Sequence, residues 1–291
     1  MCGSTRVSTD NGRLWTFGSR FRWYIACTAD GTSRARGRCS TSTGRGVRAL
    51  ATVPPMSEEP DIYELHGPAT HEATSGVWNT WGTLDSHVIG HLINPSFMGG
   101  PRWPALRQGH VISRRDDALL VASDGLADPM RWNDAEPSNG YEVEVYGIGE
   151  RFGGDDTMGV AANWLGQLVM SLSNTVAQHG ITFTRQLEHW GTLTVAFGGV
   201  AVPGSHEEKY VDGSGNVVAV LGLDDEKELP STVDGPLSTI RLVNAKLLTV
   251  SEADFCVQSG TGQQEAREEL GRRFAEQGGK IRSWLDREAV A

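Results

Sequence analysis

The sequence predicts an α+β fold, in which a mixed, mainly antiparallel sheet packs against one long amphipathic helix and a shorter C-terminal helix. Strand-like runs come in neighbouring pairs, such as Val111–Arg115 and Ala118–Ala122, which a short turn can join into an antiparallel hairpin. The two helix-like runs, Thr157–His179 and Glu265–Gln277, are separated by several strands. A doubly wound parallel sheet would instead alternate helices with strands, so the pattern favours the α+β class.

Charge divides the 291-residue chain into two parts. Residues 1–55 hold nine Arg, no Lys, two Asp and no Glu, a balance of +7, whereas the remaining 17 basic and 34 acidic residues give −17. We expect residues 1–55 to be a basic disordered extension. We interpret it as upstream sequence translated in error, because Met56 opens the acidic run Met-Ser-Glu-Glu-Pro-Asp. A transit peptide and a basic nucleic-acid-binding arm are the alternatives. Residues 56–291 are predicted to form a single domain.

Composition also bears on compartment and partners. Only Cys256 lies outside residues 1–55, so the predicted domain has no disulfide framework, which suits a reducing cytoplasm. The apolar cluster Phe21–Ala26 is too short for a signal peptide or a membrane span. Lys and Arg are not clustered in the acidic part, so we do not expect nucleic acid as a partner. We also expect no membrane partner and no cofactor.

The elements expected before residue 150 are mostly short. Asp61–His66 is predicted as a short helix or strand, Thr70–Thr83 as irregular, and Leu84–Ile93 as a strand, followed by a loop rich in Pro and Gly. Beyond the hairpin, Tyr141–Tyr146 alternates polar and apolar residues, which predicts a half-buried strand. We expect Gly147-x-Gly149 to be a flexible connection.

The later elements begin with the long helix Thr157–His179. Asp155 and Asp156 suit its N-terminus, and Gly180 suits its end. Apolar residues recur there at spacings of three and four, so Trp164, Leu168 and Leu172 are expected to face the sheet. The other predictions are strands at Trp190–Val202, Val217–Leu223 and Ile240–Val250, a short turn opened by Ser251, the helix Glu265–Gln277, and a loose tail over Ile281–Ala289.

Four histidines provide the one constellation that favours an enzyme. His66, His71, His87 and His91 fall within 26 residues, and Glu72 or Asp85 could complete a three-ligand zinc site. A metal-dependent hydrolase is therefore the alternative function. Ordinary surface or core histidines are the simpler interpretation, because the segment lacks HExxH and CxxC.

Carboxylates gather around a turn in the middle of the chain. Asp124 and Asp128 flank Gly125-Leu126-Ala127, and we expect them to bond backbone amides of the turn, with a hard-cation site as the alternative. Glu142 and Glu144 stand two apart on the predicted strand, which is typical of a solvated face. Because residues 56–291 carry a net charge of −17, these glutamates could also belong to an acidic docking surface.

This region resembles the Suppressor-of-fused domain. The resemblance rests on Gly125-Leu126-Ala127-Asp128, on Pro137-Ser138-Asn139-Gly140-Tyr141 and on Glu144 within a strand, and it extends over roughly Trp103 to Gln277. It implies a non-enzymatic protein-binding module. Animal members bind a transcription-factor segment as an added β-strand beside acidic residues. Many bacterial single-domain members, which this chain resembles more, look like immunity proteins that neutralise toxins.

The resemblance and the charge together predict the binding surface. The expected partner is a basic polypeptide such as a toxin, and the predicted partner-binding residues are Asp124, Asp128, Tyr141, Glu142, Glu144 and Tyr146. Two positions depart from the family pattern: Glu142 replaces a small residue, and Val121 stands where the animal proteins have a tyrosine of the binding cleft.

Overall fold

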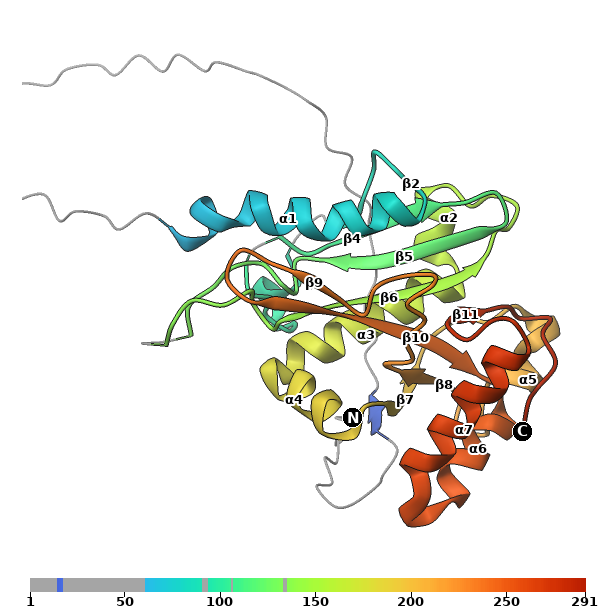
Figure 1. Cartoon of the computed structure of the whole chain (residues 1–291). Coiled ribbons are helices and arrows are strands. Elements are labelled where there is room, and N and C mark those ends of the chain that lie inside the picture. The colour runs from blue at the N-terminus through green and yellow to red at the C-terminus, as the bar shows by residue number, and fades with distance from the viewer. Residues whose placement is uncertain (1–14, 18–60, 91–93, 106, 133–134) are drawn as a thin grey trace, which may run out of the picture.

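The computed structural model describes residues 15–17 and 61–291, apart from 91–93, 106 and 133–134 (Figure 1). Of the predicted N-terminal extension, only Trp15–Phe17 is described, and it forms strand β1, which pairs in parallel with β7. At these three residues the structure differs from the expected disorder, because their backbone continues the hydrogen bonding of a sheet edge. The rest of residues 1–55, with its interpretation as mistranslated sequence, lies outside the described residues.

An open mixed sheet forms the middle of the molecule. Its main path is β1-β7-β8-β10-β6-β5-β4-β2, with β3 beside β4, β9 beside β10 and β11 beside β6. The β1–β7, β6–β10 and β6–β11 pairs are parallel and the other described pairs are antiparallel, which confirms the predicted fold class. The strands after β1 are β2 (Thr83–Leu84), β3 (Ile89–Gly90), β4 (Gly109–Arg114), β5 (Ala118–Asp124), β6 (Val143–Glu150), β7 (Leu193–Gly198), β8 (Asn216–Leu221), β9 (Thr232–Asp234), β10 (Thr239–Leu248) and β11 (Arg282–Ser283).

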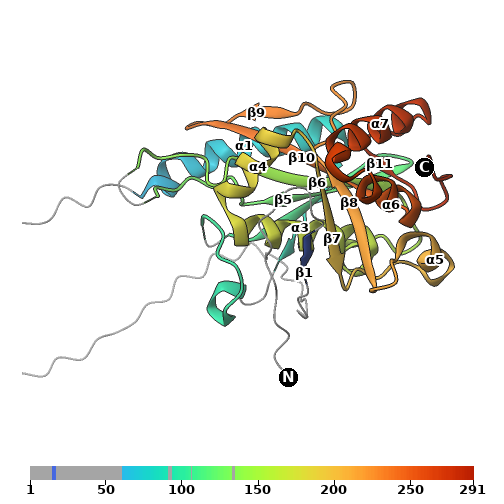
Figure 2. The ribbon, with the colours of Figure 1, turned by 90° about the horizontal axis from the view of Figure 1, so that it is seen from below.

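Helices cover both faces of this sheet (Figures 1 and 2). Side chains of β5 alternate between two cores: Leu119 and Val121 pack with α3, whereas Leu120 and Ala122 pack on the side of α1, α6 and α7. Because both faces are covered, β5 is buried along its whole length. The helices are α1 (Ile62–Trp81), α2 (Thr157–Ala162), α3 (Trp164–His179), α4 (Ile181–Trp190), α5 (Glu207–Tyr210), α6 (Val250–Gln258) and α7 (Gln263–Glu276), with 3-10 turns η1 (Pro95–Met98), η2 (Gly204–His206) and η3 (Gly260–Gly262).

Helix α1 is longer than the sequence predicted. Asp61 caps it by accepting a hydrogen bond from the Tyr63 amide at 3.0 Å, and the helix then continues through the segment expected to be irregular. Its buried residues recur at helical spacing: Gly67, Thr70, Thr74, Trp78 and Trp81. The first three of these are small or carry a hydroxyl group. A buried stripe of this kind gives little hydrophobic periodicity, so the pattern did not reveal it.

The predicted long helix is divided in two. Asn163 is extended and ends α2, and its side chain accepts a hydrogen bond from the Leu165 amide at 3.1 Å, which starts α3. Trp164, Leu168 and Leu172 are buried against the sheet, as predicted. Gly180, with φ of 58°, ends α3 as expected, but the chain turns there directly into α4.

Other expectations were wrong in detail. Gly147 and Gly149 lie inside β6 and form no flexible connection, because the space that their missing side chains leave is filled by Leu165 and Trp164 of α3. The turn expected at Ser251 is helix α6, capped by Thr249, and the expected loose tail contains β11. Cys256 is buried and free. None of the described helices is both long enough and apolar enough to cross a membrane.

Candidate functional site

The predicted docking turn is a buried structural unit. Glu144 on β6 is 2% exposed, and its carboxylate accepts hydrogen bonds from the Gly125 amide at 3.1 Å, the Ala127 amide at 2.9 Å and the Ser123 hydroxyl. The carboxylate thereby ties the turn after β5 to the neighbouring strand. Gly125 is needed there, because its φ is 132° and a Cβ would meet the Arg107 carbonyl oxygen at 2.6 Å. Burial is the main cause that raises the pKa of Glu144 to about 7.

Asp124 and Asp128 pair with Arg107 and not with backbone amides as predicted. Arg107 Nη1 lies 2.9 Å from Asp124 Oδ2, and Arg107 Nη2 lies 2.7 Å from Asp128 Oδ1. His71 Nδ1 lies 3.3 Å from Asp124 and 2.9 Å from Arg107. Burial raises the pKa of Asp128, an effect partly opposed by Arg107, and the hydrogen bond to Asp124 raises the pKa of His71. Both carboxylates are therefore already occupied by a cation within the chain.

The two tyrosines among the predicted partner-binding residues, Tyr141 and Tyr146, are also buried. The Tyr141 hydroxyl donates to the Arg102 carbonyl at 2.6 Å, and its ring stacks on Trp132 with centroids 5.4 Å apart. Tyr146 is 2% exposed and contacts Trp78, with ring centroids 5.6 Å apart. Five of the six predicted partner-binding side chains are buried. The prediction that they form an exposed strand face is therefore wrong.

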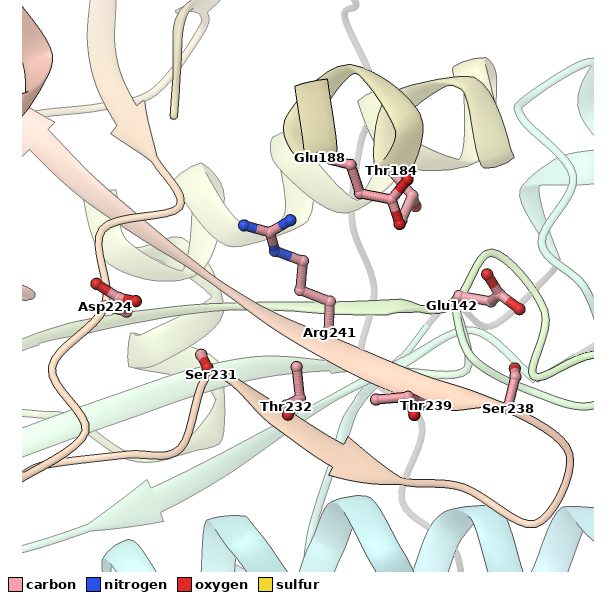
Figure 3. Close-up of a pocket in the computed structure, with 9 residues that line it drawn as sticks. All are labelled: Glu142, Thr184, Glu188, Asp224, Ser231, Thr232, Ser238, Thr239 and Arg241. Atoms are coloured by element: carbon pink, nitrogen blue, oxygen red, sulfur yellow. The ribbon is translucent and has the colours of Figure 1, made fainter. Parts of the chain in front are cut away.

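Glu142 is the exception. It lies one residue before β6 begins at Val143, and its φ of 58° turns its side chain away from the strand's alternation. Glu142 therefore shares no face with Glu144. Its side chain instead lines a pocket between α4 and the β9–β10 hairpin, which we call the acidic pocket (Figure 3).

The acidic pocket has a volume of about 440 Å³. Its lining residues come from α4, from β9 and β10 with their flanks, from the residue before β6 and from the segment after β8: Glu142, Thr184, Glu188, Asp224, Ser231, Thr232, Ser238, Thr239 and Arg241. Figure 3 shows Thr184 and Glu188 projecting from α4, with Arg241 extending from β10 between Glu188 and Asp224. The lining thus holds three carboxylates and one guanidinium group.

The charged groups of the acidic pocket are largely unpaired. Among the described residues, Glu142, Glu188 and Arg241 form no ion pair, and Asp224 has only a 3.5 Å contact with the Lys280 ammonium. Asp224 also opens the acidic run Asp224–Glu228, which borders the pocket. The excess of carboxylates and the surrounding hydroxyl groups suit a cationic, hydrogen-bonding ligand.

A free strand edge lies beside this pocket. β9 pairs with β10 on one side, and no described strand pairs with its other edge. In the register, Thr232 lies opposite Arg241 and Asp234 lies opposite Thr239, so these four side chains share the face that lines the pocket. Val233 and Ile240 point to the other face and pack in the core near α1. Glu188, Asp224 and Arg241 were not predicted as site residues, although the acidic run was a visible signal.

The three described histidines of the predicted cluster do not form a metal site. His66 and His71 lie on α1, and His87 lies in the segment before β3, next to the Ser86 hydroxyl at 3.1 Å. His91 lies outside the described residues. Within the part of the chain that the structure describes, no group of three or more His, Cys, Asp or Glu side chains is arranged to hold a metal ion.

No protein-family model and no curated protein sequence matches the chain. The resemblance to the Suppressor-of-fused domain therefore remains a prediction from the quoted motifs.

Proposed function

We propose that this protein is a non-enzymatic protein-binding module of the Suppressor-of-fused type, and that it binds a basic polypeptide segment at the acidic pocket. The observation that carries the proposal is the excess of carboxylates over guanidinium groups beside the free edge of β9. A toxin neutralised by an immunity protein is the partner class that the resemblance suggests.

The edge of β9 can take an added strand through main-chain hydrogen bonds. Because Ile240 and Val233 form the bonded pair toward β10, the amide and carbonyl groups of Thr232 and Asp234 point outward. An added strand would place alternate side chains on the face of Thr232 and Asp234. Lysine or arginine at those positions would meet Asp234 directly and the pocket carboxylates beyond it.

The carboxylates of the acidic pocket would mainly increase the rate at which a cationic partner associates. Glu188, Asp224 and Thr232 are exposed, so solvent and salt screen their interactions with a partner. Complementary charge at such a rim increases the association rate and selects against acidic partners, whereas the strand pairing holds the complex. Binding should therefore weaken as the salt concentration rises.

Selection from a displayed library of random peptides on the immobilised full chain tests the proposal. We expect a class of binders with Lys or Arg at alternate positions. The double variant Glu188→Lys with Asp224→Lys should weaken this class by about tenfold or more, corresponding to about 1.4 kcal/mol. The matched control is Glu265→Lys with Asp254→Lys, which makes the same charge change at exposed acids on α7 and α6.

Two results would contradict the proposal. Binders without cationic residues would show that charge does not select the partner. Cationic binders that the control variant weakens as much as the pocket variant would show that only the net charge of the protein matters.

A further inference from the structure

A second and larger concavity lies at the start of α1. It has a volume of about 1000 Å³ and runs between the first turns of α1, residues 102–105, 107 and 108, and the segment 129–131. We call it the α1 groove and define it by Tyr63, Leu65, Arg102, Trp103, Gln108 and Arg131. It shares no lining residue with the acidic pocket.

Two buried polar atoms in the wall of the α1 groove lack partners. Trp103 is 2% exposed and Gln108 is 9% exposed, and neither the Trp103 Nε1 donor nor the Gln108 Oε1 acceptor has a hydrogen-bond partner. Buried polar groups are normally paired, because a buried group without a partner has lost its hydrogen bonds to water and gained none in return. Trp103 and Gln108 both line the α1 groove, so its wall contains an unpaired donor and an unpaired acceptor, each covered from solvent.

The α1 groove also carries unpaired positive charge. Arg102 and Arg131 are exposed and form no ion pair within the described residues, whereas Arg107 already holds Asp124 and Asp128. Asp61 is the one carboxylate among the described residues that line the groove, and its side chain caps α1. On a chain with a net charge of −10, this local excess of guanidinium groups favours acidic side chains in a ligand.

One large apolar side chain that lines the same groove is exposed. Leu65 lies on the first turns of α1 and is 56% exposed. An exposed leucine in a polar-lined concavity suits contact with an apolar side chain of a polypeptide ligand.

We infer that the α1 groove binds an acidic polypeptide segment with at least one large apolar side chain. The apolar side chain packs against Leu65, and acidic side chains pair with Arg102 and Arg131. This site is independent of the proposed function, because its ligand has the opposite charge and its residues lie elsewhere.

The same peptide selection separates the two sites. A second class of binders, rich in Asp or Glu and in Leu, Phe or Trp, is expected. Arg102→Glu with Arg131→Glu should weaken this class by about tenfold or more and leave the cationic class intact. The control variant Arg185→Glu with Lys227→Glu reverses the same number of exposed positive charges on α4 and in the loop before β9, and it should leave the acidic class within about twofold of the unmodified protein.

Gln108→Met tests the unpaired acceptor. The substitution removes a buried acceptor that has no partner, so the melting temperature should stay the same or rise, while affinity for the acidic class falls by about two- to tenfold. Loss of stability without loss of affinity would show that Gln108 is only structural.

Three outcomes would overturn the inference. One is a selection that gives no acidic class, and another is an acidic class that Arg102→Glu with Arg131→Glu leaves intact. The third is concentration-dependent dimerisation that this variant abolishes, since a second copy of the chain would then occupy the groove.

Discussion

Glu142 and Glu144 stand two residues apart, yet the fold gives them opposite roles. Glu144 is buried and accepts three hydrogen bonds from the turn after β5, whereas Glu142 is partly exposed and faces the acidic pocket. Spacing of two implies a shared face only if both residues belong to the strand. β6 begins at Val143, and the positive φ of Glu142 breaks the alternation just before it.

The comparison shows how a carboxylate can serve structure or recognition within one short motif. The Glu144 carboxylate accepts the backbone amides that a tight turn would otherwise leave unpaired, so its partners are fixed by the fold. Glu142 has no partner among the described side chains and stays available to a ligand. In this chain, the acid that matches the family motif is thus the structural one of the two.

The largest expected effect is on Glu144. Glu144→Ala leaves the Gly125 amide, the Ala127 amide and the Ser123 hydroxyl without their acceptor in a dry environment, and should lower the free energy of unfolding by about 3–5 kcal/mol. Glu142→Ala should change it by less than about 0.5 kcal/mol. Urea denaturation of both variants makes the measurement. If both variants lost the same small amount of unfolding free energy, Glu144 would have no greater structural role than Glu142.

Arg107 also has a structural role at this turn, because it pairs with Asp124 and Asp128. Arg107→Ala leaves the buried carboxylates of Asp124 and Asp128 without their cation. Because Arg107 is itself 29% exposed, water partly replaces it, and a loss of about 2–4 kcal/mol is expected. Arg131→Ala is the matched control, an exposed arginine nearby without a described partner, and should cost less than about 0.5 kcal/mol. A similar loss in both variants would mean that the ion pairs contribute little.

The burial of Glu144 also predicts a pH dependence. Its folded pKa of about 7 lies above its ordinary value of 4.5, so folding takes up a proton between these values. The stabilisation is complete below about pH 4.5 and is lost as pH rises through 7. The raised pKa values of Asp128 and His71 act in the same direction.

Glu144→Gln isolates this contribution. The unmodified protein should lose about 2 kcal/mol more of unfolding free energy between about pH 5 and about pH 8 than the glutamine variant, which cannot ionise there. Denaturation curves across this range measure the difference. Parallel curves would show that Glu144 is ionised throughout.

The sequence predicted the parts of the fold that depend on regular hydrophobic patterns. The β4–β5 hairpin and the buried face of α3 follow from apolar spacing. The part of helix α1 after His66 was missed because its buried stripe begins with Gly67, Thr70 and Thr74. Helix α4 was missed because Gly180 was expected only to end a helix. Such elements are fixed by tertiary packing more than by local pattern.

The site was harder to predict, because it depends on contacts between distant segments. In the sequence Asn139 stands out only as part of the motif Pro137–Tyr141, but in the fold it is fully buried. It bonds Thr70 of α1, the Ala127 carbonyl and the amides of Leu237 and Ser238. Likewise, Glu142, Glu188 and Asp224 line one pocket only because α4 and the β9–β10 hairpin lie on either side of it in the folded chain. No spacing in the sequence encodes that approach.

The smallest expected effect separates the backbone of Glu142 from its charge. A residue other than glycine at φ of 58° is strained by roughly 1 kcal/mol, and glycine removes that strain but is more flexible when unfolded. Glu142→Gly should therefore raise the free energy of unfolding by about 0.5 kcal/mol or leave it unchanged, whereas Glu142→Ala keeps the strain. Both variants lose the same carboxylate, so both should weaken cationic peptides equally in the selection described above. If only the glycine variant loses affinity, the backbone conformation at this position shapes the acidic pocket and the carboxylate does not.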